Sequence, residues 1–326
     1  MNQTSQTIGL SGVAGVLPGY QQDLNQLNAA GLLSSLPETL EALGFQRAHL
    51  CEPEVPPEQM ALEAAQLALN DAGLRPADID FLIWASARPE NHLRTNDAAS
   101  APASGCDPMN GFRYASAWLQ DALDLHNADV LAVAQQGCST MFSALRIARS
   151  LLLAEPRRQH ALCVGVDRLP HGATREILYN VISDAASAVV VSRGCQQDVW
   201  VGYSQISRGY YWDPSQSQSQ ILAAYFPTAA VLLRQLLAQH SLRADEIDVV
   251  VPTGVSRASW DILLRLVGIP EDRLFTAVPS FGHTMTSDTF VHLQELRRRG
   301  ALPRGSRLLL FTFGFGCSWC GLLLEH

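Results

Sequence analysis

Continuously apolar stretches alternate along this chain with amphipathic ones. A strand buried on both faces typically appears as a short apolar run, whereas a helix packed on a core shows apolar residues at a period of about 3.6. The second pattern predicts helices at 139–155 and 257–268. The first predicts central strands at 129–135 (DVLAVAQ), 161–167 (ALCVGVD), 187–192 (SAVVVS) and 307–314 (RLLLFTFG).

The two halves of the chain repeat one sequence unit. AGLRPADIDFLIWAS at 72–86 is matched by HSLRADEIDVVVPTG at 240–254, so that Asp80 and Asp248 are equivalent, 168 residues apart. Each copy follows an amphipathic helical stretch, at 57–71 and 227–239, and leads into a short apolar strand. A helix, loop and strand that recur together indicate a duplication.

Alternating helices and strands, with strands covered on both faces, indicate an α/β protein built in layers. The repeat predicts two similar halves, residues 1–195 and 196–326, which meet near SRGCQQD at 192–198. The polar, locally simple stretch DPSQSQSQ at 213–220 is expected to form a loop over the entrance to a site.

Composition indicates a soluble globular protein, because 47% of the 326 residues are hydrophobic and 17% are charged. The 31 acidic residues outnumber the 23 basic ones, and there is no clustered Lys/Arg tract, so nucleic acid is not an expected partner. We find no run of about 18 apolar residues and no signal peptide in MNQTSQTIGL, and therefore expect no membrane association and a cytoplasmic location.

Cys138 stands out among the seven cysteines, whose odd number and wide spacing indicate reduced thiols. It follows Gly137, where the predicted strand 129–135 turns into the predicted helix 139–155. The free amides and positive dipole of a helix N-terminus stabilise a thiolate, so this position suits a nucleophile. The alternative is a buried thiol that packs as a small hydrophobe.

The pair CSWC at 317–320 could indicate a metal or redox site. A structural zinc site needs four ligands, and no second such pair exists in the sequence. We therefore expect no metal here.

Several segments in order resemble the thiolase-fold condensing enzymes of the ketoacyl-acyl carrier protein synthase III type. VAQQGCSTMFSAL is similar to the nucleophile turn of that family, and FGHTMTSD to the turn that carries its asparagine. The other similar segments are ALEAAQLALNDAGLRPADIDFLIWAS, CVGVD, SDAASAVVVS, DVVVPTGVSRASWDILLRLVGIPEDRLF and FGFGCSWCG.

The resemblance implies a thiolase-like fold with two duplicated βαβαβ-type halves in a layered α/β/α/β/α arrangement. It makes Cys138 the acyl-accepting thiol. It also implies that no cofactor is bound permanently and that the substrate is a thioester of coenzyme A or phosphopantetheine.

Two departures from the family pattern concern the groups needed for decarboxylation. Where the family has the histidine of PHQAN, this chain reads PTGVS and supplies Thr253. Where the family has asparagine, it supplies His283. A decarboxylating enzyme needs the histidine and asparagine together to stabilise the enolate oxygen, and a threonine hydroxyl cannot move protons as an imidazole does.

The stretch GHTMTSD is similar to that of a divergent branch, the synthase III-like acyltransferases, in which a nucleophile works with a shifted histidine and a carboxylate. This similarity implies a catalytic set of Cys138, His283 and Asp288. A set of this kind suits acyl transfer, because the imidazole deprotonates an acceptor and the carboxylate orients the imidazole. Asp288 could instead only cap the helix that follows it.

Backbone amides of Cys138 and Phe315 occupy the places that form the oxyanion hole in the family. The family normally has glycine where this chain has Phe315.

These features favour an acyltransferase that moves an acyl group from a coenzyme A or acyl carrier protein thioester through Cys138 to a small-molecule or carrier acceptor, in polyketide or other specialised metabolism. The alternatives are a condensing enzyme that uses Cys138 and His283, and a non-catalytic partner subunit of a heteromeric complex. The resemblance implies a homodimer, and a heterodimer with a related subunit stays open. Arg88, Arg257 and Trp260 are candidates for the coenzyme A entrance.

Overall fold

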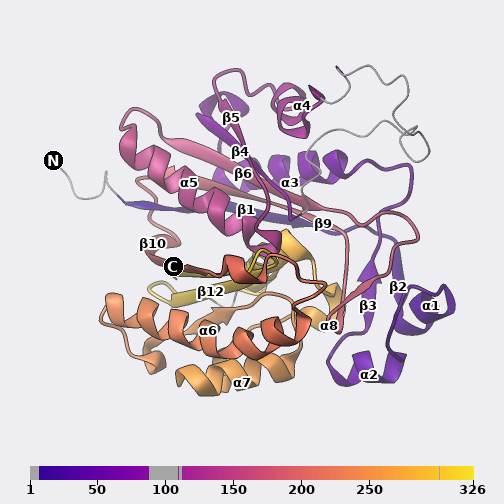
Figure 1. The fold of residues 1–326 in the computed structure, drawn as a ribbon. Coiled ribbons are helices and arrows are strands. Elements are labelled where there is room, and N and C mark those ends of the chain that lie inside the picture. Colours follow the sequence, from indigo (N-terminus) through magenta and orange to yellow (C-terminus); the bar gives the residue numbers. More distant parts are fainter. Residues whose placement is uncertain (1–6, 88–108, 110–111, 301) are drawn as a thin grey trace.

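The computed structural model of the chain describes residues 7–87, 109, 112–300 and 302–326 (Figure 1). Arg88, one of the three entrance candidates, lies outside the described residues. A nine-stranded mixed sheet has the order β11-β12-β13-β10-β1-β9-β6-β4-β5. Its strands are β1 (Ile8–Val16), β4 (Phe81–Ala85), β5 (Asp129–Val133), β6 (His160–Asp167), β9 (Ala185–Arg193), β10 (Val199–Ser207), β11 (Val249–Val251), β12 (Arg307–Gly314) and β13 (Ser318–Glu325).

Helices cover both outer faces of the sheet and fill the layer between its two halves. The longer ones are α3 (Pro57–Ala72), α4 (Ala115–Ala122), α5 (Thr140–Ala154), α6 (Gln218–Gln239), α7 (Arg257–Val267) and α9 (Asp288–Arg298). The short elements are α1 (Leu24–Ala29), α2 (Pro37–Ala42) and α8 (Val278–Phe281), with the two-stranded pairs β2 (Gln21–Asp23) and β3 (Arg47–His49), and β7 (Glu176–Ile177) and β8 (Asn180–Val181).

Alternating side chains of the strands divide the core into three apolar layers. In β6, Cys163 faces the layer shared with α5 and α9, and Leu162 faces α3 and α4. In β12, Leu310 faces the same shared layer, and Leu309 faces α6 and α7. The order of layers is therefore α/β/α/β/α, with α6 and α7 on one outside and α3 and α4 on the other (Figure 1).

The two halves of the sheet have matching topology. Strands β4, β6, β9 and β1 follow one another in the same order and directions as β11, β12, β13 and β10, with the first pair parallel and the others antiparallel. The halves join at β1 and β10, through Gly9 and Val199. A domain boundary at residue 195 stays a prediction.

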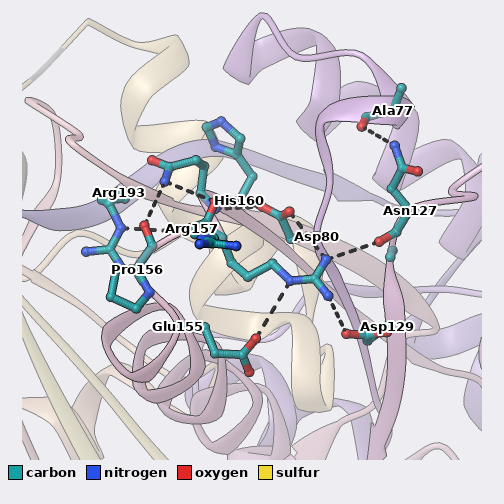
Figure 2. A network of polar contacts seen from close by, with 12 residues as sticks. Ala77, Asp80, Asn127, Asp129, Glu155, Pro156, Arg157, His160 and Arg193 are labelled. Atoms are coloured by element: carbon teal, nitrogen blue, oxygen red, sulfur yellow. Dashed lines mark hydrogen bonds and ion pairs between the residues drawn. The ribbon is translucent and has the colours of Figure 1, made fainter.

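The repeated Asp80 and Asp248 perform the same structural task. Asp80 Oδ2 accepts hydrogen bonds from the amides of Gln159 (2.6 Å) and His160 (3.0 Å), where β6 begins beside β4. Figure 2 shows Asp80 between His160 and Asp129 at this end of the sheet. Asp248 Oδ2 accepts from the amide of Arg307, 2.8 Å away, where β12 begins beside β11. The repeated sequence unit thus contains, in each half, a carboxylate that aligns two neighbouring parallel strands.

Most predicted elements are confirmed, including β6, β9, β12, α5 and α7. The prediction of a central strand at 129–135 is wrong, because β5 has only β4 as a neighbour. Asp129, Leu131 and Ala132 are exposed on this edge strand. An apolar run therefore does not distinguish a central strand from an edge strand whose surface is left open.

The predicted polar loop at 213–220 is partly wrong, because α6 begins at Gln218 and continues through Pro227. By length and composition alone, α6 is the one helix among the described residues that is apolar enough to cross a membrane. Its buried side chains, including Leu232 and Leu236, pack against α7 and the sheet. Its opposite face, which includes Leu222 and Val231, is exposed, so α6 covers the sheet from the outside.

Replacing Asp80 by alanine tests the role of the repeated carboxylate. The change leaves two strand amides without an acceptor, so we expect the free energy of unfolding to fall by about 1–3 kcal/mol. Urea unfolding measures it, with Asp121→Ala, an exposed aspartate of α4, as the control. Equal stability of the two variants would contradict the assignment.

Candidate active site

Cys138 lies in a tight turn that leads from β5 into α5. Gln135 and Gly137 both have positive φ angles, 69° and 54°. A Cβ atom on Gly137 would also collide with the backbone of Phe315. Glycine is therefore required at 137 for both conformation and space, and the turn presents Cys138 at the N-terminal end of α5.

His283 is held by its backbone between two segments. Its amide donates to the carbonyl of Val181 (2.7 Å), and its carbonyl accepts from the amide of Ser183 (2.9 Å). Gly282, with φ of 68°, allows the chain to turn from α8 into this position. The imidazole Nε2 lies 3.4 Å from Cys138 Sγ, although 145 residues separate them. The geometry thus brings together two of the predicted site residues.

Asp288 lies on the other side of the His283 ring. Its Oδ2 is 2.5 Å from Nδ1, the distance of an ion pair, although the ring nitrogen is not aligned as in a hydrogen bond. The carboxylate is buried and accepts four hydrogen bonds. Thr253 Oγ1 (2.8 Å) and the Gly254 amide (2.7 Å) donate to Oδ2, while the Thr284 amide (2.5 Å) and hydroxyl (2.9 Å) donate to Oδ1.

The Asp288 side chain does not cap α9, which was the structural alternative. Ser287 is the N-cap residue of this helix, and no side chain donates or accepts a capping hydrogen bond there. All the partners of the carboxylate lie outside the helix. Asp288 therefore occupies the first turn of α9 while its charge is directed at His283.

Thr253, which stands where the family has its histidine, supports the carboxylate. Its hydroxyl donates to Asp288, and its carbonyl accepts from the indole Nε1 of Trp260, 3.1 Å away. Trp260 is buried against Phe311, so its assignment as an entrance residue is wrong. The helical spacing of Trp260 with Leu263, Leu264 and Val267 was the signal that could have shown this.

The charges of the His283 and Asp288 pair stabilise each other. Burial lowers the pKa of His283, but the negative charge of Asp288 and the neighbouring Cys138 outweigh it, so this pKa lies well above its ordinary value. Burial raises the pKa of Asp288, and the charge of His283 more than offsets that effect, so this pKa lies below its ordinary value. The buried pair therefore favours imidazolium and carboxylate.

A cavity of about 480 Å³ opens onto Cys138, His283 and Thr253. Its wall is mostly apolar and contains no Lys or Arg among the residues described. The wall is formed by Leu43, Ala87, Gly137, Cys138, Leu169, Ile177, Leu178, Tyr179, Asn180, Ile221, Leu222, Tyr225, Phe226, Thr253, Val255, Ser256, Ser259, His283, Met285, Phe313 and Phe315.

Phe315 lines this cavity, and its backbone lies against Gly137, next to Cys138. An oxyanion hole made by the amides of Cys138 and Phe315 stays a prediction. Arg257 is not among the residues that line the cavity; it pairs with Asp261 at 2.7 Å on the surface of α7.

The CSWC pair does not form a joint site. Cys317 packs in the layer of α6 and α7, whereas Cys320 faces the layer of α5 and α9. Both are free thiols. No group of three or more metal-binding side chains occurs in the part of the chain that the structure describes.

Asp167 is a supporting residue that sequence reasoning did not single out. Its buried carboxylate accepts from the amides of Ala87 (2.9 Å) and Thr286 (3.0 Å), and burial raises its pKa to about 6. Thr286 belongs to the turn between His283 and Asp288, in which Met285 has a φ of 52°. An aspartate at the end of an apolar strand was the signal that could have identified it.

The C-terminal part of the chain, residues 237–326, matches the family model described as 3-oxoacyl-[acyl-carrier-protein] synthase III C terminal. The beta-ketoacyl-[acyl-carrier-protein] synthase III of Sphingopyxis alaskensis is 27% identical over 309 residues, which cover 88% of this chain and 89% of that protein. That of Clostridium perfringens is 23% identical over 291 residues, covering 82% and 83%. Over most of its length the chain is therefore similar to the synthase III family.

Solved structures show the same fold. The synthase III of Aquifex aeolicus superposes with a TM-score of 0.83 at 19% identity, covering 98% of this chain and all of that one. ChlB3, described as an acyltransferase, superposes with a TM-score of 0.80 at 21% identity, covering 98% and 97%. The predicted thiolase-like fold is therefore confirmed.

The charge of Asp288 is expected to control the protonation of His283. In Asp288→Asn the main attraction for the imidazolium is removed while burial remains, so the pKa of His283 should fall. Heteronuclear NMR of the ring across the pH range measures this shift. A His283 pKa that stays high in Asp288→Asn would contradict the coupling, and Asp261→Asn, on the surface of α7, is the control.

Proposed function

We propose that this protein is an acyltransferase that moves an acyl group from a coenzyme A or acyl carrier protein thioester, through a Cys138 acyl-enzyme, to a small-molecule or carrier acceptor. The observation that carries the proposal is the row formed by Cys138 Sγ, the His283 ring and the Asp288 carboxylate. The His283 imidazole thus contacts the Cys138 thiol with one ring nitrogen and the buried Asp288 carboxylate with the other.

The first step forms the acyl-enzyme. The Cys138 thiolate attacks the thioester carbonyl, and the amides of Cys138 and Phe315 stabilise the resulting oxyanion. The bond from the carbonyl carbon to the donor sulfur then breaks. His283, as imidazolium, gives its proton to the departing thiolate and becomes neutral.

The second step transfers the acyl group. The neutral His283 takes a proton from the acceptor, whose oxygen, nitrogen or sulfur attacks the acyl carbon. The bond to Cys138 breaks and the thiolate returns beside the imidazolium. Asp288 stabilises the imidazolium in this state and orients the ring, and Thr253, Gly254 and Thr284 hold Asp288 in place.

Thr253 also speaks against the decarboxylating alternative. Its hydroxyl is engaged with Asp288, so Thr253 cannot supply the second imidazole that would share enolate charge with His283. The cavity wall offers no Lys or Arg for a malonyl carboxylate among the residues described. The alternative of a non-catalytic subunit is disfavoured by the contact of Cys138 with His283.

The proposal places the protein in the cytoplasm, in polyketide or other specialised metabolism, with no permanently bound cofactor. We also propose a homodimer that pairs through the edge strand β5, since within the described residues this strand has a neighbour on one side only and Leu131 is 38% exposed. Leu131→Arg should convert such a dimer to a monomer in sedimentation velocity. Unchanged sedimentation would contradict this interface. A wild type that is a monomer alone and associates only with a related subunit would indicate a heterodimer instead.

Intact-protein mass spectrometry tests the acyl-enzyme. After exposure to a series of acyl thioesters, the wild type should gain the mass of the acyl group, and Cys138→Ala should not. His283→Ala should slow formation of the adduct roughly hundredfold to ten-thousandfold, the range for removal of a general acid or base.

Cys163→Ala, a buried strand cysteine away from the cavity, is the matched control and should keep the adduct. Absence of any adduct on the wild type across short, long and branched donors would defeat the proposal.

A further inference from the structure

The hairpin of β7 and β8 carries an unusual turn at the cavity. Its two turn residues, Leu178 and Tyr179, both have positive φ angles, 48° and 64°. A two-residue hairpin turn of this kind favours Asn-Gly, because side chains other than Asn, Asp and Gly are strained there. Strain of this type persists only where the surroundings enforce it, and it concentrates at functional sites.

Contacts on both sides enforce the turn. The Asn180 side-chain amide donates to the carbonyls of Ile177 and Leu178, each at 3.0 Å. The Glu176 carboxylate accepts from the amides of Ser34 and Ser35, each at 2.8 Å, and from the Ser35 hydroxyl at 2.6 Å. The hairpin is thus fixed to the loop that follows α1.

The same hairpin is hydrogen-bonded to the proposed catalytic histidine, His283. Val181, the last residue of β8, accepts the hydrogen bond from the amide of His283. The position of the turn is therefore rigidly related to the position of the imidazole. A substitution at the tip of this hairpin therefore changes the cavity wall while the hydrogen bond between Val181 and His283 stays in place.

Leu178 and Tyr179 lie between two cavities. They line the apolar cavity of about 480 Å³ that holds Cys138. They also line a second cavity, of about 590 Å³, whose wall contains Ser34, Glu176 and Gln218. The two cavities share Ile177, Leu178, Tyr179 and Phe315.

We propose that the Leu178 and Tyr179 turn is a specificity wall, which closes the apolar cavity and restricts acyl transfer to apolar acyl groups without a charged end. Asn-Gly would make the same turn without strain, but it would supply no apolar surface. The cost of placing Leu178 and Tyr179 in this turn is therefore explained by the apolar surface that their side chains give to the cavity. Within the described residues neither cavity wall contains Lys or Arg, and the carboxylate of Glu176 is already hydrogen-bonded.

This inference rests on the proposed acyl transfer and has its own test. The double variant Leu178→Asn/Tyr179→Gly relieves the strain and removes the wall. We expect a higher melting temperature than that of the wild type. We also expect the ratio of Cys138 adduct rates for octanoyl over succinyl thioester to fall about tenfold or more, the scale on which an apolar wall discriminates.

Ser241→Gly is the matched control, because Ser241 also has a positive φ, 54°, but is not among the residues lining either cavity. It should raise the melting temperature without changing the rate ratio. The single variant Tyr179→Gly gives a second measurement if the double variant does not fold.

An adduct that forms on the wild type with an unchanged rate ratio in these variants would overturn the wall while leaving acyl transfer intact. A wild type that forms no adduct would overturn both proposals. A melting temperature that falls in Tyr179→Gly while that of Ser241→Gly rises would contradict strain in the turn.

Discussion

The site depends on the buried Asp288 carboxylate. A buried charge is costly unless it is paired and hydrogen-bonded, and here four donors and the His283 ring surround it. The donors come from the end of β11 and from the turn before α9. The end of β11 and the turn before α9 are therefore both hydrogen-bonded to Asp288, and His283 directly precedes this turn.

The layered fold brings the two halves of the chain together at this point. Cys138 comes from the first half, at the start of α5, and His283 from the second half, just before α9. Both helices lie in the shared middle layer, where Phe142 and Phe290 pack with ring centroids 5.8 Å apart. The 3.4 Å contact between sulfur and imidazole is thus a consequence of how the two halves of the sheet enclose one pair of helices.

Sequence patterns predicted the parts that depend on local order. The apolar runs of β6, β9 and β12 and the glycine before Cys138 were sufficient to place strands, helix and turn. The edge position of β5 was missed, since its sequence is as apolar as that of a covered strand. The burial of Trp260 was missed although its spacing with Leu263, Leu264 and Val267 places it on the apolar face of α7; the sequence does not show that Phe311 is its partner there.

The partners of Asp288 also lay beyond the sequence. A carboxylate in the first turn of a helix satisfies the rules for a cap, and only the packing of β11 against that turn shows that Thr253 and Gly254 hold it. The same holds for Leu178 and Tyr179, whose residue types do not predict their turn. Sequence reasoning therefore placed the proposed reacting groups together but did not show the residues that position them.

The most direct test of the account is the fate of a labelled malonyl thioester. A site with Thr253 tied to Asp288 and with His283 as its one catalytic imidazole should transfer acyl groups and release no carbon dioxide. Trapping of labelled carbon dioxide during incubation with an acylated enzyme measures this outcome. Release in equal amount to a carbon-carbon coupled product would contradict acyl transfer and make the protein a condensing enzyme.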